Sequence, residues 1–193
     1  AEDASNSQEF SEYIRDVIAI NQNVYPDDST EAGRYLRLKQ QYFFVSAGLT
    51  ALIKAHLRVY DTLDNFAEKN AIQLNDTHPV LAIPELMRIL MDDYLYEWDD
   101  AFRIVQESVA YTNHTVLSEA LEKWPVKMIQ TLLPRIYMII EEIDRRYCYD
   151  LNYKYYRPDL INSTRIIIDG QVHMAHLAII GSHSVNGVAS LHT

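Results

Sequence analysis

A cluster of polar and ionisable side chains follows a short apolar segment near the middle of the chain. Residues 71–74 have the pattern of a buried strand, and Asn75, Asp76, Thr77 and His78 come directly after it, before a Pro-containing turn into a predicted helix. Open α/β sheets bind ligands at this position, where strands end and helices begin. Taken alone, these residues favour a structural role, in which Asp76 and Thr77 cap the helix and His78 binds a backbone carbonyl. The pattern therefore indicates a candidate ligand site, with a plain helix start as the alternative.

The same arrangement recurs further along the chain. An apolar segment at residues 109–112 runs into Asn113, His114 and Thr115, and residues 181–187 form another loop of similar polar character. A histidine such as His114, considered alone, is more often a structural residue than a ligand. The recurrence adds a second and a third candidate ligand loop.

Hydrophobic periodicity and turn residues predict a helix-rich chain. We expect helices at residues 10–24, 36–60, 84–93, 99–107, 118–124 and 134–147. Residues 173–180 fit either a strand or a short helix, and we favour the helix. We expect strands at residues 71–74, 109–112 and 185–188, and a hairpin around the Asp-Gly pair of residues 165–171. The helix at 36–60 should be largely buried, and the carboxylate run at 141–144 should be a solvated helix face. Parallel strands with helices between them would form part of a βαβ-type sheet.

Length and composition are typical of a soluble globular chain. At 193 residues it is long enough for one domain with a sizeable core, and its 48% apolar content argues against disorder. A formal charge of −10 disfavours a nucleic-acid surface, which needs a basic face. No apolar run reaches the length of a membrane span, and the single cysteine, Cys148, fits a reducing compartment. We therefore expect a cytoplasmic protein with no membrane or nucleic-acid partner.

Metal binding and serine catalysis receive little support from the spacing of the side chains. His173 and His176 lie three residues apart, and Asp76 and His78 lie two apart. Neither is a recognised zinc spacing, and no cysteine cluster accompanies them. The Ser-His pair at 182–183 is adjacent in sequence, so its side chains point apart. We therefore expect no metal site and no catalytic triad.

Four segments of the chain resemble a known family. The runs at residues 36–47, 71–88, 109–124 and 181–187, in this order, resemble the α-1,4-glucan phosphorylases, which act on glycogen, starch or maltodextrin. The resemblance implies an α/β fold, namely a partial Rossmann-like N-terminal domain of a two-domain, GT-B-like glycosyltransferase. Such a domain fragment is helix-rich and has a few parallel strands.

The resemblance assigns roles to residues of several loops. His114 is implied to position the substrate and to support the transition state, without transferring a proton. The wall of the glucosyl pocket is implied to contain Asn75, Asp76, His78, Asn113, Thr115 and Ala120. The Asn, Asp, Thr and His side chains of this set supply the directional donors and acceptors that a sugar requires, and Ala120 lines the same pocket. Asp27 and Asp28 fall in a segment that matches the family's mobile loop at the catalytic entrance.

The resemblance also implies what lies outside the chain. Residues 1–193 would be a fragment of the N-terminal catalytic domain, with residues 1–9 as a flexible N-terminus and without the cofactor-binding C-terminal domain. The implied cofactor of the full-length enzyme is pyridoxal 5'-phosphate, whose lysine is not expected here because no lysine lies in a Gly-rich segment. The cofactor's phosphate group is implied to relay the proton, so no glycosidase-like carboxylate pair is needed. The isolated chain is therefore expected to be inactive.

The implied reaction is phosphorolysis, in which an α-1,4-glucan and inorganic phosphate give glucose 1-phosphate. A homodimer is implied through the helix at residues 10–24, whose apolar stripe contains Tyr13, Ile14, Val17 and Ile18. One alternative is a non-catalytic carbohydrate-binding or scaffold fragment. Another is a metal-dependent hydrolase that uses Asp76, His78, His114 and His183.

Overall fold

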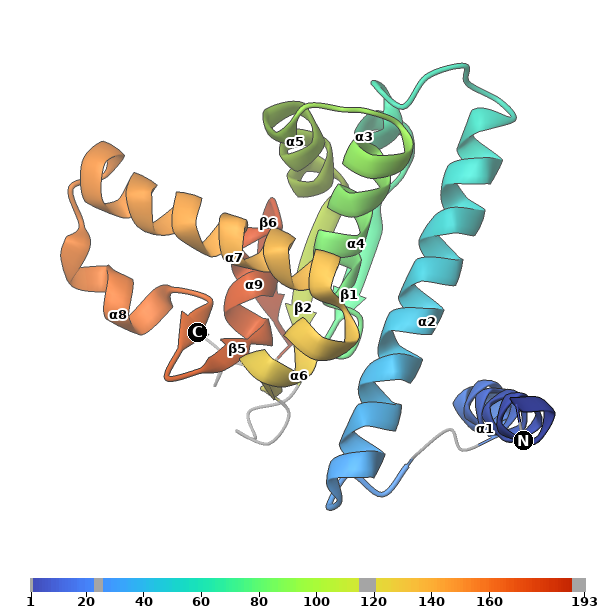
Figure 1. The fold of residues 1–193 in the computed structure, drawn as a ribbon. Coiled ribbons are helices and arrows are strands. Elements are labelled where there is room, and N and C mark those ends of the chain that lie inside the picture. The colour runs from blue at the N-terminus through green and yellow to red at the C-terminus, as the bar shows by residue number, and fades with distance from the viewer. Residues whose placement is uncertain (1, 23–25, 115–120, 189–193) are drawn as a thin grey trace. The chain divides into compact units, whose positions relative to one another are not determined.

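The computed structural model describes residues 2–22, 26–114 and 121–188 of the chain (Figure 1). Contacts divide the chain into two units, residues 1–44 and residues 45–193. Among the helices of the described part, none is long and apolar enough to cross a membrane.

The first unit consists of helix α1 (Glu2–Gln22) and the first part of helix α2 (Glu31–Leu57). Helix α1 begins at Glu2, which corrects the predicted start at residue 10. The predicted flexibility of residues 1–9 stays a prediction.

The long helix predicted at residues 36–60 is confirmed as α2, but it is less buried than expected. Phe43 and Phe44 are 44% and 57% exposed. Apolar residues occupy more than one face of this helix, so a single packed face does not cover them all. Within the first unit, Lys39 Nζ lies 3.0 Å from Asp16 Oδ2 and joins α2 to α1.

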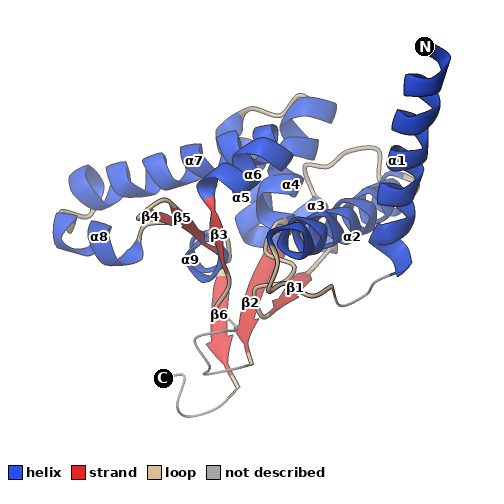
Figure 2. Cartoon of the chain, turned by 60° about the horizontal axis from the view of Figure 1, so that its bottom comes forward, coloured by secondary structure: helices blue, strands red, loops and turns tan. Residues whose placement is uncertain are grey.

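The second unit contains a three-stranded parallel sheet in the order β1-β2-β6 (Figure 2). Its strands confirm the three predicted ones and are β1 (Ile72–Asn75), β2 (Val109–Asn113) and β6 (Ser184–Gly187). The register aligns Asn75 with Thr112, and Thr112 with Asn186. Because all three strands run the same way, their carboxyl ends meet at one edge of the sheet.

Helices provide the connections between these strands. Around β1 and before β2 lie α3 (Phe66–Lys69), α4 (Ala82–Arg88), a π-helical turn (Ile89–Asp93) and α5 (Trp98–Ser108). Before β6 lie α6 (Val126–Leu132), α7 (Pro134–Tyr149), a π-helical turn (Asp150–Lys154), a 3₁₀ turn (Pro158–Leu160), α8 (Ile161–Thr164) and α9 (Met174–Ile180). The helices predicted at 84–93, 99–107, 134–147 and 173–180 are confirmed with shifted ends. Buried apolar residues of α4, α5 and α7 form much of the core, including Ile83, Leu86, Ile104, Ile140 and Ile143. The unit is a helix-rich α/β fold.

The second unit also contains a small antiparallel sheet, whose strands lie in the spatial order β3-β5-β4. These strands are β3 (Lys123–Pro125), β5 (Gln171–His173) and β4 (Ile167–Ile168). Strands β4 and β5 form the predicted hairpin, and its turn residues Asp169 and Gly170 both have positive φ, 50° and 71°. Strand β3 corrects the helix predicted at 118–124, because its backbone pairs with β5. Residues 118–120 of that prediction lie outside the described residues.

The prediction that residues 141–144 form a solvated helix face is wrong at Asp144 on α7, whereas Glu141 is exposed as predicted. The Asp144 carboxylate is buried, with only 2% of the residue exposed. It accepts hydrogen bonds from Arg165 Nη2 at 2.6 Å, from the Ile166 backbone N–H at 2.6 Å and from the Ile167 N–H at 3.3 Å. The side chain therefore ties α7 to the segment that leads into the hairpin, and its partners lie too far along the chain for helical periodicity to indicate them.

Candidate functional site

The turn after β1 is held in an uncommon backbone conformation. Asp76 has a φ of 59°, in the left-handed region that aspartate tolerates better than most residues other than glycine. Its backbone N–H donates to the Thr112 carbonyl at 2.8 Å, which continues the β1–β2 ladder by one bond. The turn is therefore tied to β2 at the point where both strands end.

His114, which follows β2, is bound to this turn twice. Its backbone N–H donates to Asp76 Oδ1 at 2.8 Å, and its Nε2 lies 3.1 Å from Asn75 Oδ1. An amide oxygen only accepts, so Nε2 carries the hydrogen and Nδ1 is left as an acceptor in the neutral ring. The ring is exposed to solvent. The site thus presents an oriented hydrogen-bond acceptor at the carboxyl edge of the sheet.

A row of polar side chains crosses the three strands beneath these loops. Gln73 Nε2 donates to Thr112 Oγ1 at 2.7 Å, and Thr112 Oγ1 donates to Asn186 Oδ1 at 2.6 Å. Sequence reasoning did not single out Gln73, Thr112 or this pairing. Side chains alternate between the two faces of each strand, and this alternation could have indicated which residues share a face. It identifies cross-strand partners only when the strand register is known. This row fixes the three strand ends relative to one another.

The structure brings together four of the predicted site residues. His114 is hydrogen-bonded to both Asn75 and Asp76. Asn113 directly precedes His114 at the end of β2, where the Asn113 carbonyl accepts the Val188 N–H at 3.3 Å. Two others, Thr115 and Ala120, lie outside the described residues.

His78 is placed differently from these residues. It is exposed in the turn that leads into α4. Within the described part of the chain, no hydrogen bond of its side chain to Asp76 or His114 is formed. Its assignment to the pocket wall stays a prediction.

His183 lies at the amino ends of the strands, whereas His114 lies at their carboxyl ends. This placement corrects the alternative prediction of a hydrolase site that combines His183 with His114, Asp76 and His78. Its backbone N–H donates to the Val109 carbonyl at 3.0 Å, and its Nδ1 lies 3.0 Å from the Gln106 carbonyl. His183 lies beside Val109, at the start of β2, and His114 follows the end of that strand. The two histidines are therefore about 16 Å apart along the strand at ordinary strand geometry. Within the described residues, no group of three or more His, Cys, Asp or Glu side chains is placed to hold a metal ion.

The predicted entrance loop belongs to the first unit. Hydrogen bonds from the Ser29 side chain and then from the Ser29 backbone N–H, which lies 3.0 Å from Asp27 Oδ1, lower the pKa of the Asp27 carboxyl group. Asp28 forms an ion pair with Arg37. Gly33 is required here, because a Cβ at this position would lie 1.7 Å from the Asp27 carbonyl oxygen. The loop is thus locally ordered by its own contacts, and its role at an entrance stays a prediction.

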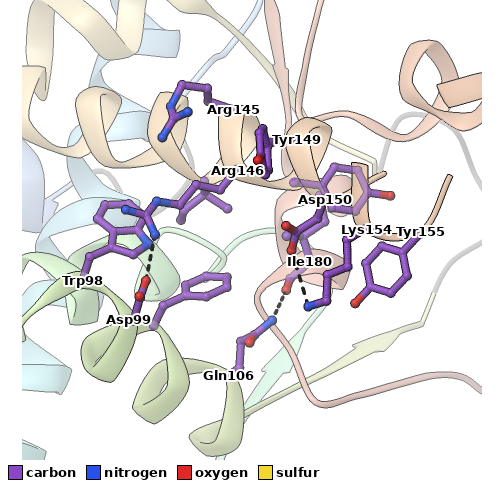
Figure 3. Close-up of a pocket in the computed structure, with 13 residues that line it drawn as sticks. Trp98, Asp99, Gln106, Arg145, Arg146, Tyr149, Asp150, Lys154, Tyr155 and Ile180 are labelled. Carbon is purple, nitrogen blue, oxygen red and sulfur yellow. Dashed lines mark hydrogen bonds and ion pairs between the residues drawn. The ribbon is translucent and has the colours of Figure 1, made fainter. Parts of the chain in front are cut away.

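A cavity of about 780 Å³ lies in the second unit between α5, α7 and the π-helical turn after α7 (Figure 3). One of its lining residues, Gln106, donates to the Ile180 carbonyl at 2.9 Å, close to the amino end of β2. The cavity is therefore at the other end of the strands from His114. Its walls combine aromatic rings with charged groups, as Trp98 and Asp99 illustrate in the figure.

The cations that line this cavity already have partners. Arg146 binds Asp99 and Glu142, both at 2.7 Å, and Arg145 binds Glu142 at 2.6 Å. Hydrogen bonds from Arg145, and then from Arg146, lower the pKa of Glu142 to about 2. Lys154 lies 3.9 Å from Asp150. Because these charges are neutralised within the wall, the cavity does not have the character of a phosphate-binding site.

The fold and the site define an α/β protein with polar loops at the carboxyl edge of a parallel sheet. Residues 2–193 match the carbohydrate phosphorylase family, and the chain belongs to that family. It is 48% identical to a glycogen phosphorylase of Bacillus subtilis over 182 residues, covering 94% of this chain and 23% of that protein.

Other relatives come from distant organisms. The H isozyme of alpha-glucan phosphorylase from Solanum tuberosum is 50% identical over 182 residues, covering 88% of this chain and 22% of that protein. The muscle form of glycogen phosphorylase from Ovis aries is 46% identical over 186 residues, covering 90% of this chain and 22% of that protein. The chain thus spans about a fifth of the length of the relatives it matches.

The lysines of this chain do not fit a covalently held pyridoxal phosphate. Their side chains are half-buried at Lys39 and exposed at Lys54, Lys69, Lys123, Lys127 and Lys154. A lysine that forms a Schiff base needs a desolvated pocket that lowers its pKa and encloses the ring. In the part of the chain that the structure describes, these lysines lie on open surface or in ion pairs with aspartates.

Proposed function

We propose that this chain is part of an α-1,4-glucan phosphorylase, a glycosyltransferase that releases glucose 1-phosphate from glucan ends by phosphorolysis. The observation that carries the proposal is the placement of His114 on the Asn75–Asp76 turn, at the carboxyl edge of a parallel sheet, in a chain of this family. The sheet is proposed to be part of the Rossmann-like N-terminal half of a two-domain, GT-B-like fold. We also propose that residues 1–193 are a fragment of this N-terminal catalytic domain.

The chain's contribution is to bind and orient a terminal glucosyl unit. With Nε2 directed at Asn75, Nδ1 of His114 accepts a hydrogen bond from a sugar hydroxyl. The Asp76 carboxylate holds the His114 backbone, so the carbonyl of that residue is fixed for interaction with the carbon on which positive charge develops. Asn113, Thr115, Ala120 and His78 complete the proposed wall. These groups stabilise the transition state by preorganisation and transfer no proton.

Pyridoxal phosphate is the proposed cofactor of the full-length protein, where its phosphate group supplies acid–base chemistry to the substrate phosphate. Because the lysines of this chain do not fit it, the cofactor site is assigned to another part of that protein. The loop with Asp27 and Asp28 is proposed to line the catalytic entrance, where its negative charge would oppose phosphate. A cytoplasmic location is proposed with this function.

The test of the proposed function is phosphate dependence. The full-length protein, incubated with maltodextrin, should form glucose 1-phosphate only when inorganic phosphate is present, and a chelator should not change the rate. The 193-residue chain alone should form none. Release of free glucose without phosphate would overturn the proposal, and binding of maltodextrin without any turnover would identify a carbohydrate-binding module instead.

A homodimer through α1 is proposed from an exposed apolar stripe. Tyr13, Ile14, Val17 and Ile18 are 64%, 38%, 41% and 43% exposed. Burying such a stripe against its counterpart stabilises association by roughly 25 cal/mol per Å² of apolar surface, and two-fold pairing is the commonest arrangement.

The double substitution Val17→Glu with Ile18→Glu is expected to convert the full-length dimer to monomer, because it places charges in the proposed contact. Light scattering measures the mass. Ser11→Glu with Gln22→Glu adds the same charge at exposed polar positions of α1 and should leave the dimer intact. A dimer that survives the first pair of substitutions has its interface elsewhere.

A further inference from the structure

The turn that holds His114 is itself anchored by a buried side chain. Thr77 is fully buried, whereas Asn75 and His78 on either side of the turn are exposed. The Thr77 Oγ1 donates to Glu122 Oε2 at 3.2 Å and accepts the Glu122 backbone N–H at 3.4 Å. A single hydroxyl thus binds both the side chain and the backbone of one residue, 45 positions away in the sequence.

Glu122 connects this turn to the small antiparallel sheet and to α9. Its carbonyl accepts the Met174 backbone N–H at 3.1 Å, and it directly precedes strand β3. The anchor therefore extends from the turn after β1, through Glu122, to the start of a packed helix.

The need for such an anchor follows from the backbone of the turn. Asp76 adopts a left-handed conformation, which persists only where surrounding contacts over-determine it. Asp76 and Asn75 hold His114, and Thr77 is the next residue along the chain. A displacement of the turn would move both of the groups that orient His114.

We infer that Thr77 and Glu122 are positioning residues for the reaction, acting through Asn75 and Asp76 on His114. The inference rests on the proposed function, since it concerns the same glucosyl site. It assigns a role to one residue whose side chain is buried in the turn after β1 and to another that precedes β3. Removal of the Thr77 or Glu122 side chain should lower kcat more than it weakens binding of the glucan. The reason is that a small displacement of His114 affects the rate of the chemical step most.

The test compares hydroxyl-removing and hydroxyl-retaining variants of the full-length protein. Thr77→Val should lower kcat by about 10–100-fold and change KM by less than about threefold, and Glu122→Ala should act similarly. Thr77→Ser should recover most of the rate. The double variant should be no slower than the slower single variant, because both substitutions remove one interaction.

Thr164→Val is the matched control. The Thr164 hydroxyl also takes part in two hydrogen bonds, to the Leu160 carbonyl at 2.8 Å and with the Tyr147 hydroxyl at 2.9 Å, and it lies away from the site. Its loss should change kcat less than about twofold. A comparable loss of rate in this control, or equal rates for Thr77→Ser and Thr77→Val, would overturn the inference in favour of general destabilisation or lost packing.

Hydrogen exchange provides a readout that does not depend on activity. Thr77→Val should accelerate exchange of the His114 and Glu122 amides, and Thr77→Ser should not. An inactive wild-type protein would overturn the proposed function and with it the catalytic consequence, while the exchange data would still report the anchor. An active wild type with unchanged kcat and unchanged exchange in Thr77→Val would overturn the inference alone.

Discussion

His114→Ala in the full-length protein is expected to lower kcat by about 10–1000-fold and to change the KM for glucan much less. The substitution removes the ring whose Nε2 is bound to Asn75, and with it the Nδ1 acceptor proposed to meet the sugar. A preorganised polar contact close to developing charge contributes most in the transition state. Initial rates of glucose 1-phosphate formation over a range of maltodextrin concentrations separate kcat from KM.

His183→Ala is the matched control for this prediction. His183 is an exposed histidine at the opposite edge of the same sheet, where its Nδ1 contacts the Gln106 carbonyl. Its removal should leave kcat within about threefold of wild type. If a folded His114→Ala protein retains the wild-type rate, or if both variants lose activity alike, His114 has a structural role.

Asp144→Ala is expected to have the largest effect on stability, about 3–5 kcal/mol. The substitution leaves the Ile166 N–H without its acceptor in a buried position and removes the partner of the Arg165 guanidinium. Since whole domains are stable by only about 5–15 kcal/mol, a loss of this size would open the segment between α7 and the hairpin. Native-state hydrogen exchange at the Ile166 amide of the full-length protein measures the free energy of local opening.

The control substitution Asp159→Ala tests whether the loss of stability in Asp144→Ala results from the burial of Asp144. Asp159 also binds an arginine, Arg157 at 2.9 Å, but both side chains are more than half exposed. Exposed pairs contribute about 0–1 kcal/mol, so exchange in the core should stay unchanged. Equal effects of the two substitutions would show that the contacts of Asp144 do not stabilise the fold in the expected way.

The features that depend on neighbouring residues could be predicted from the sequence. The apolar segments that end in polar clusters predict β1 and β2, and the Asp169-Gly170 pair predicts the hairpin turn that the positive φ angles confirm. The resemblance carried by four segments predicts the family that the comparisons establish. These features depend on neighbours within a few residues, so they are visible in a single chain.

Only the tertiary structure decided which of the polar residues meet. Parallel pairing of β1 and β2 brings Asp76 and His114 into contact across 38 positions of sequence, and it places His183 at the other edge of the sheet. Pairing with β5 made Lys123 and Trp124 a strand, against their predicted helix.

The burial of individual polar side chains also depended on the tertiary structure. Packing of α7 against the hairpin turned Asp144 inward, and the contact with Glu122 made Thr77 an anchor. Hydrogen bonds and burial between distant segments depend on the strand register and on which elements pack together. The hydrophobic periodicity of a single segment contains no information about either. The sequence by itself therefore determined the strand ends, the turn and the family, whereas the contacts that orient His114 came from the fold.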